Sequence, residues 1–230
     1  MAHDKRRVGE KREFNPNAMA GINTHALVLK SLAGKRGKVA DLGAGQGTLS
    51  VELARMGFEV YACDVCAEGF QANGLPNIHF CVVDLHERLP YPDGSLDFAC
   101  AVEVIEHLEN PRRFLRECHR ILKSDGMLIL STPNVLSLAS HISFLFKGCL
   151  IYFDQREYLS NHHITPLRLQ DVENMFREVG FRMVKIDFNV GKLPIPKLRH
   201  KLPMLAKPFR NRWLGESLMV WAVKDSSLLP

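Results

Sequence analysis

The sequence predicts an α/β protein with a doubly wound, mostly parallel sheet. Short apolar runs, typical of buried strands, alternate along the chain with stretches of helical periodicity. A turn with three closely spaced glycines, at residues 43–47, joins the first apolar run to a helix. Acidic residues follow several of the runs directly, and the carboxyl ends of parallel strands are where such sheets bind ligands. We therefore expect a ligand site at that edge of the sheet.

The individual elements are predicted from apolar spacing and from the residues that begin and end them. Asn110 is a suitable N-cap, Gly34 and Gly57 each end a helical stretch, and Asp125-Gly126 forms a turn before the fifth strand. The predicted strands span residues 38–42, 58–63, 78–83, 96–102, 127–131, 181–190 and 216–224. The predicted helices span residues 17–33, 48–56, 111–122 and 166–179.

The length of 230 residues suits one α/β domain with additions, so we expect residues 1–230 to form a single domain. Residues 1–16 are polar and basic and are predicted to be an N-terminal arm. Residues 133–165 interrupt the alternation of strands and helices and are predicted to be a lid-like insertion. Residues 191–212 form a basic segment that contains no acidic residue.

The composition is that of a globular protein, with 46% hydrophobic and 24% charged residues, which excludes overall disorder. The chain opens without a signal-peptide pattern, and no apolar run approaches the roughly 20 residues of a membrane span. We therefore expect a cytoplasmic protein. The basic segment 191–212 has the composition of a segment that contacts a polyanion or, peripherally, the inner membrane face, and a solvated loop is an equal alternative.

The glycine turn is predicted to hold a cofactor with an amino group. Gly43, Gly45 and Gly47 have the spacing GxGxG, whereas the nicotinamide dinucleotide fingerprint is GxGxxG. Asp41 precedes the first glycine by two residues. A carboxylate there would repel a pyrophosphate but could help to hold a cationic amine.

The segment from Val39 to Gly47 resembles the first motif of the class I S-adenosylmethionine-dependent methyltransferases. Asp64, about 20 residues beyond the loop, resembles the acceptor for the ribose hydroxyls, and Asp84-Leu85 resembles the pair that contacts adenine. The resemblance implies S-adenosylmethionine as cofactor and a seven-stranded Rossmann-like sheet whose last strand is antiparallel. It implies cofactor contacts at Asp41, Gly43, Ala44, Gly45, Gly47, Asp64, Val65, Asp84, Leu85 and Glu103.

The segment Glu103-Val-Ile-Glu-His107 carries the candidate catalytic and metal-binding residues. A helical turn would place Glu103, Glu106 and His107 on one face. They could hold a divalent cation such as Mg²⁺, with His162 or His163 as a further ligand, or His107 could be a base oriented by Glu106. The segment resembles that of ubiquinone-pathway O-methyltransferases and RNA 3′-terminal 2′-O-methyltransferases, which use it for a magnesium-type ion. Methyltransferases without a metal carry similar sequences, so both interpretations stay open.

We therefore predict a methyltransferase that acts on a hydroxyl of a small-molecule, lipid or glycan acceptor, bound beneath the 133–165 insertion. The aromatic residues of 144–158 would line the acceptor pocket or pack the lid against the sheet. An RNA 2′-O-methyltransferase is a weaker interpretation, because no RNA-binding signature accompanies the basic residues. Two further classes stay open at this point, an NAD-linked oxidoreductase and a non-catalytic binding protein with the same fold.

Overall fold

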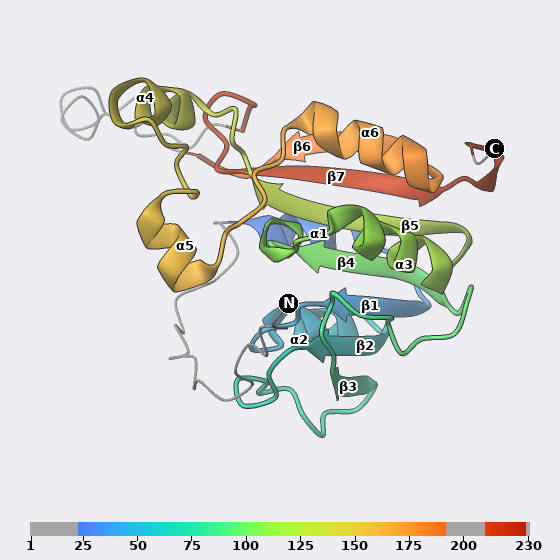
Figure 1. The fold of residues 1–230 in the computed structure, drawn as a ribbon. Helices are drawn as coiled ribbons and strands as arrows, with labels where there is room; N and C mark the ends of the chain where they lie inside the picture. The colour runs from blue at the N-terminus through green and yellow to red at the C-terminus, as the bar shows by residue number, and fades with distance from the viewer. Residues whose placement is uncertain (1–22, 192–209, 229–230) are drawn as a thin grey trace, which may run out of the picture.

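The computed structural model describes residues 23–191 and 210–228. Its centre is a seven-stranded sheet with the order β3-β2-β1-β4-β5-β7-β6 (Figure 1). β7 is antiparallel to both of its neighbours, and the remaining strands run parallel to one another. The predicted fold class, with the last strand antiparallel, is confirmed. The strands are β1 Lys38–Leu42, β2 Glu59–Asp64, β3 Ile78–Val82, β4 Leu96–Val102, β5 Leu122–Pro133, β6 Phe181–Phe188 and β7 Ser217–Lys224.

Helices cover both faces of the sheet and enclose one core on each side (Figure 1). On one face, two helices pack in a core that includes Phe58 and Trp221. On the other face, two helices pack in a core that includes Phe114 and Phe176. The first pair is α1 Thr24–Leu32 and α2 Thr48–Arg55, and the second is α3 Pro111–Ile121 and α6 Leu169–Val179.

The chain between β5 and α6 leaves this layered body. It forms α4 (Leu138–Lys147) and α5 (Gln155–Asn161), which stand at the end of the sheet where β4 and β5 finish (Figure 1). Among the described residues, the elements also include two short 3₁₀ helices, Ile105–His107 after β4 and Ser226–Leu228 after β7. None of the helices within the described ranges combines the length and the apolar character that a membrane span needs.

The fifth strand differs most from its prediction. β5 begins at Leu122, immediately after α3, so the expected Asp125-Gly126 turn lies inside the strand. Leu96 pairs with Leu122, and the register then shifts before Phe98 pairs with Met127. Asp125 adopts a positive φ of 61° within this irregularity. Asp125-Gly126 therefore forms a bulge inside the strand and does not end it, because pairing with β4 continues on both sides.

The helix predicted to begin at residue 166 begins at Leu169. The backbone N–H groups of Ile164 and Thr165 donate to the carbonyl of Glu106, over 3.0 and 2.9 Å. This pairing holds the chain extended beside the turn after β4, so the helix starts only once Arg168 and Asp171 can cap it.

Several expectations fall wholly or partly outside the described residues. The arm 1–16 lies outside them, and only Gly191 and residues 210–212 of the basic segment are described. The helix predicted for 17–33 is seen over Thr24–Leu32. The organisation of residues 1–230 as one domain stays a prediction.

Candidate functional site

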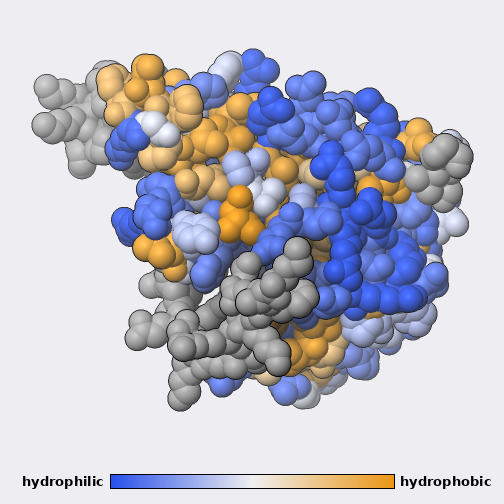
Figure 2. All heavy atoms as spheres, in the orientation of Figure 1, coloured by the Kyte–Doolittle hydropathy of each residue, from blue (hydrophilic) through white to orange (hydrophobic). Residues whose placement is uncertain are grey.

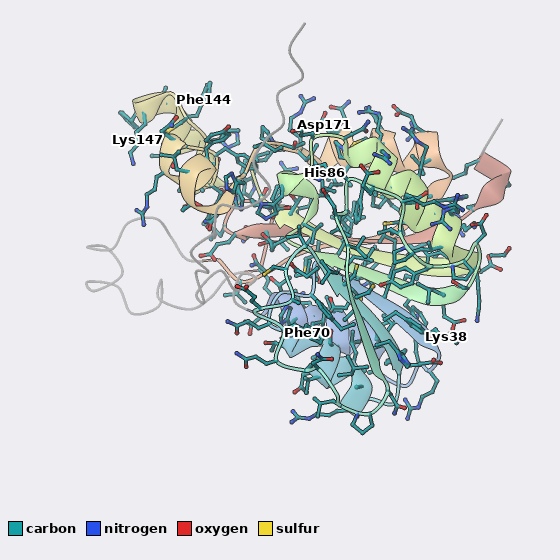
Figure 3. All side chains as sticks on the ribbon, turned by 60° about the horizontal axis from the view of Figure 1, so that its bottom comes forward. Lys38, Phe70, His86, Phe144, Lys147 and Asp171 are labelled. Atoms are coloured by element: carbon teal, nitrogen blue, oxygen red, sulfur yellow. The ribbon has the colours of Figure 1, made fainter. Side chains whose placement is uncertain are left out.

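The glycine turn adopts a backbone that only glycine accommodates easily. Gly45 has a φ of 53°, and a Cβ built there would meet no protein atom within 4 Å. Gly47 has a φ of 82°, and a Cβ there would lie 2.7 Å from Cε2 of Phe70 (labelled in Figure 3). The third glycine thus allows close packing within the protein, whereas the second borders open space that a ligand can fill.

Backbone hydrogen bonds fix the turn to the end of the neighbouring strand. The N–H groups of Gly43 and Ala44 both donate to the carbonyl of Cys63, each over 2.9 Å. The N–H of Gly45 donates to Oδ2 of Asp64 over 2.8 Å, and that of Cys66 donates to Oδ1 over 3.2 Å. Asp64 therefore organises the loop, a role that its resemblance to a ribose acceptor does not predict. An ionised carboxylate offers about four acceptor positions, so the same group can still accept from ribose hydroxyls.

Asp41 lies beneath the turn and is buried, with 2% of its surface exposed. Burial raises its pKa from 3.8 to about 6, and the nearby charge of Asp64 adds to the rise. The hydroxyl of Ser50, which donates to Oδ2 over 2.5 Å, opposes it. Asp41 is thus tied to α2, and a cationic group close by would favour its charged form.

Side chains from the loops after β3 and β4 approach the glycine turn at Gly43. A Cβ built on Gly43 would lie 2.5 Å from Cγ2 of Val104 and 3.9 Å from Cδ1 of Leu85. The loops after β1, β3 and β4 therefore converge at Gly43. Val65, after β2, is 55% exposed, which leaves an apolar surface beside Asp64.

The carboxylate of Asp84 is held by a histidine that sequence reasoning did not single out. Oδ1 accepts from the backbone N–H of His86 over 2.9 Å and lies 2.8 Å from Nδ1 of the same residue (labelled in Figure 3). The N–H of Glu109 donates to Nε2 of His86 over 3.3 Å, which assigns the proton to Nδ1. The spacing Asp-x-His, in which an aspartate binds the backbone two residues later, was the available signal.

The residues after β4 form a strained and buried group. Glu103 has a φ of 52°, and its N–H donates to the Ser131 hydroxyl, which in turn donates to Glu103 Oε1 over 2.7 Å. Glu106 is fully buried, and neither of its carboxylate oxygens has a hydrogen-bond partner of ordinary geometry among the described residues. Burial raises the pKa of Glu106 well above its usual value, and the neighbouring carboxylate of Glu103 raises it further.

Two histidines, His107 and His163, lie beside Glu106. The rings of His107 and His163 meet edge to face, with centroids 4.8 Å apart. Burial, together with His163, lowers the pKa of His107 to about 4, so its imidazole is neutral at pH 7. Nδ1 of His163 lies 2.8 Å from the carbonyl oxygen of Tyr152, so this nitrogen donates a hydrogen bond and Nε2 is the ring nitrogen left for a ligand role.

Ligand atoms from Glu106, His107 and His163 lie within 4.8 Å of one another, in an arrangement that could hold a metal ion. Glu103 stands outside this group, although its carboxylate adjoins Glu106. Of the two lid histidines weighed as a further ligand, His163 joins the group, whereas His162 caps α5 and is exposed. The sequence pattern thus identified two members of the group and left the third open.

The sheet order, the turn after β1 and the acidic strand ends together define the class I S-adenosylmethionine-dependent methyltransferase fold. A family model described as a methyltransferase domain matches residues 12–186, and the chain belongs to this family. The match to methyltransferases also weighs against a nicotinamide-dependent enzyme.

Individual relatives agree with this assignment. The chain is 34% identical over 119 residues to a probable S-adenosylmethionine-dependent methyltransferase of Mycobacterium tuberculosis, covering 50% of this chain and 43% of that protein. It is 36% identical over 109 residues to a ubiquinone biosynthesis O-methyltransferase of Xanthomonas oryzae, covering 45% of each. The chain thus spans about half the length of the curated relatives that it matches.

Solved structures share the fold at lower identity. A protein of Thermotoga maritima described as a possible histamine N-methyltransferase superposes with a TM-score of 0.64, at 21% identity and 87% coverage of both chains. A putative methyltransferase of Bacillus halodurans has a TM-score of 0.63, at 18% identity, covering 88% of this chain and 99% of that one.

Gly45→Val is expected to weaken binding of S-adenosylhomocysteine by roughly tenfold or more. No protein atom fills the space at the Cβ position of Gly45, so the valine side chain would occupy space that we expect the ligand to fill. Isothermal titration calorimetry measures the affinity. Gly74→Val is the matched control, since Gly74 also has a positive φ, of 79°, and open space around its Cβ position, but lies outside the loop. Equal affinities for the two variants would refute the assignment of the loop.

The pKa of Asp41 predicts a pH-dependent contribution to stability. Because the folded protein binds this proton more tightly than the unfolded chain, the contribution of Asp41 to stability falls as the pH rises from about 4 to about 6. The full loss corresponds to about 3 kcal/mol. Asp41→Asn has no such titration, so its free energy of unfolding relative to the wild type should rise over this range in urea titrations. A difference that does not vary with pH would contradict the assignment.

Proposed function

We propose that this protein transfers the methyl group of S-adenosylmethionine to a hydroxyl of a small-molecule, lipid or glycan acceptor. Membership of the methyltransferase family supports the donor, and the loops that converge at Gly43 supply backbone and carboxylate groups suited to it. The ubiquinone biosynthesis O-methyltransferases among the relatives support oxygen as the accepting atom. The acceptor would approach beneath the α4–α5 insertion.

Methyl transfer is an in-line displacement. The acceptor oxygen forms a bond to the methyl carbon while the bond from that carbon to sulfur breaks, and S-adenosylhomocysteine leaves as a neutral thioether. The protein has to align the two partners and accept the hydroxyl proton, because the sulfonium is already activated.

The observation that carries the choice of oxygen chemistry is the group Glu106, His107 and His163. A fully buried carboxylate without well-formed hydrogen bonds is costly, and a divalent cation would satisfy it. The neutral imidazole of His107 and Nε2 of His163 fit ligand roles, and the carbonyl of Tyr152 orients His163. A cation such as Mg²⁺ held there would lower the pKa of a bound hydroxyl.

The same group can be considered without a metal. His107 would then be the base for the hydroxyl proton, oriented by Glu106. Burial holds the pKa of His107 near 4, which makes it a weak proton acceptor. We therefore favour the metal-ligand role for His107, with Glu103 as a neighbour that the Ser131 hydroxyl holds in place.

S-adenosylhomocysteine is expected to raise the melting temperature of the protein in a concentration-dependent manner, because it binds only the folded state. NAD should produce no shift. Differential scanning fluorimetry with each compound provides the comparison. Stabilisation by NAD alone would refute the proposed donor, and the absence of binding to S-adenosylhomocysteine would favour a non-catalytic binding protein.

His163→Ala is expected to reduce turnover at least about tenfold while the affinity for S-adenosylhomocysteine stays unchanged, because the variant removes a proposed metal ligand and leaves the cofactor loops intact. His162→Ala, in the exposed neighbour, is the matched control. Release of S-adenosylhomocysteine is followed with a panel of hydroxyl acceptors, including lipids, glycans and RNA, with and without Mg²⁺. Mn²⁺ binding, measured by paramagnetic resonance, gives an independent comparison. Full activity in a chelator would contradict the metal-ligand role.

A further inference from the structure

Helix α4 is amphipathic in the opposite sense to a helix that packs on a protein core. Its buried residues are Ser140 and Ser143, and Ser137 caps its first turn. Its exposed residues include Leu138, Ile142, Phe144, Leu145 and Phe146, the last two with 76% and 80% of their surface exposed. Leu138, Ile142 and Leu145 follow helical spacing and therefore form one stripe. The apolar side of α4 is thus turned away from the protein.

This exposed face is concentrated in one place. Figure 2 shows hydrophobic atoms gathered over α4, which stands clear of the sheet in Figure 1. Trp213, half exposed, adjoins the helix, because the N–H of Leu138 donates to the Trp213 carbonyl over 2.7 Å. We call Trp213 and the five exposed apolar residues of α4 the α4 surface. Consecutive exposed aromatic and aliphatic residues of this kind mark an interaction site.

Positive charges border the α4 surface. Lys147 is the last residue of the helix (Figure 3), and the guanidinium of Arg212 lies 4.4 Å from the ring centroid of Trp213. Neither side chain forms an ion pair with any residue in the described ranges. The chain outside the structure between Gly191 and Arg210 carries five further lysines and arginines and no acidic residue. It re-enters the structure three residues before Trp213.

The charges decide between the candidate occupants. A second copy of this chain, with its net charge of +5, would bring the same cations together across the α4 surfaces, which is unfavourable. An anionic lipid surface attracts these cations, and apolar side chains can enter its acyl region. A helix of 10 residues is too short to span a bilayer, so it would lie in the interface.

We propose that the α4 surface docks on anionic lipid bilayers, with Phe144, Leu145 and Phe146 entering the interface and Lys147 and Arg212 contacting lipid headgroups. Docking would place the edge of the sheet that holds the candidate site against the membrane, where a lipid acceptor can reach it. This last step rests on the proposed function, whereas the docking itself does not.

The test is flotation of the 230-residue chain with vesicles of phosphatidylcholine, alone or mixed with phosphatidylglycerol. The wild type should float with the anionic vesicles, and less so as salt is added. Phe146→Glu should reduce the partition coefficient by at least about tenfold, since burying one large apolar side chain favours the membrane by that much. Lys147→Gln should lower binding to the anionic vesicles only.

Leu75→Glu is the matched control, because Leu75 is 45% exposed and lies just before the edge strand β3, whereas α4 stands beyond the end of the sheet where β4 and β5 finish (Figure 1). It should float like the wild type, and all variants should keep their affinity for S-adenosylhomocysteine, which shows that they fold. Failure of the wild type to bind either vesicle, or equal loss in Leu75→Glu and Phe146→Glu, would overturn the proposal. So would a wild-type dimer that Phe146→Glu converts to a monomer, which would assign the surface to a second copy.

Discussion

The candidate site depends on the hydrogen bonds that tie the glycine turn to the end of β2. Three consecutive N–H groups, from Gly43 to Gly45, point to Cys63 and Asp64, so the turn cannot relax independently of the neighbouring strand. β1 and β2 are adjacent parallel strands, which brings the acidic end of one beside the loop of the other. A backbone held in this way is preorganised, so a ligand does not have to order it upon binding.

Buried acidic groups show where the fold retains polar chemistry at the expense of stability. Asp41, Glu103 and Glu106 all lie in surroundings that raise the pKa of their carboxyl groups, chiefly through burial. Glu103 also adopts a positive φ that is unfavourable for a residue with a side chain. Unfavourable features that gather at the carboxyl edge of one sheet are typical of a functional site, since packing alone would favour apolar residues there.

The layered body and the α4–α5 insertion follow different physical rules. In the body, helices bury their apolar faces against the sheet in two cores. In α4 the small hydroxyl residues face inward and the large apolar ones face outward, and α5 has no buried residue at all. The body therefore accounts for the fold and for the cofactor loops, and the insertion presents surfaces that are suited to contacts outside the chain.

The sequence by itself determined the sheet, the order of its elements and the glycine turn, because apolar periodicity and glycine spacing are local signals. It also singled out Asp41, Glu106 and His107 as candidate site residues, from their positions relative to strands. Only the tertiary structure decided that Asp64 supports the turn, that His86 holds Asp84, and that His163 joins Glu106, since these contacts depend on how the loops fold against one another. It likewise decided which side of α4 faces outward, because helical spacing predicts an amphipathic helix but does not say what each face packs against.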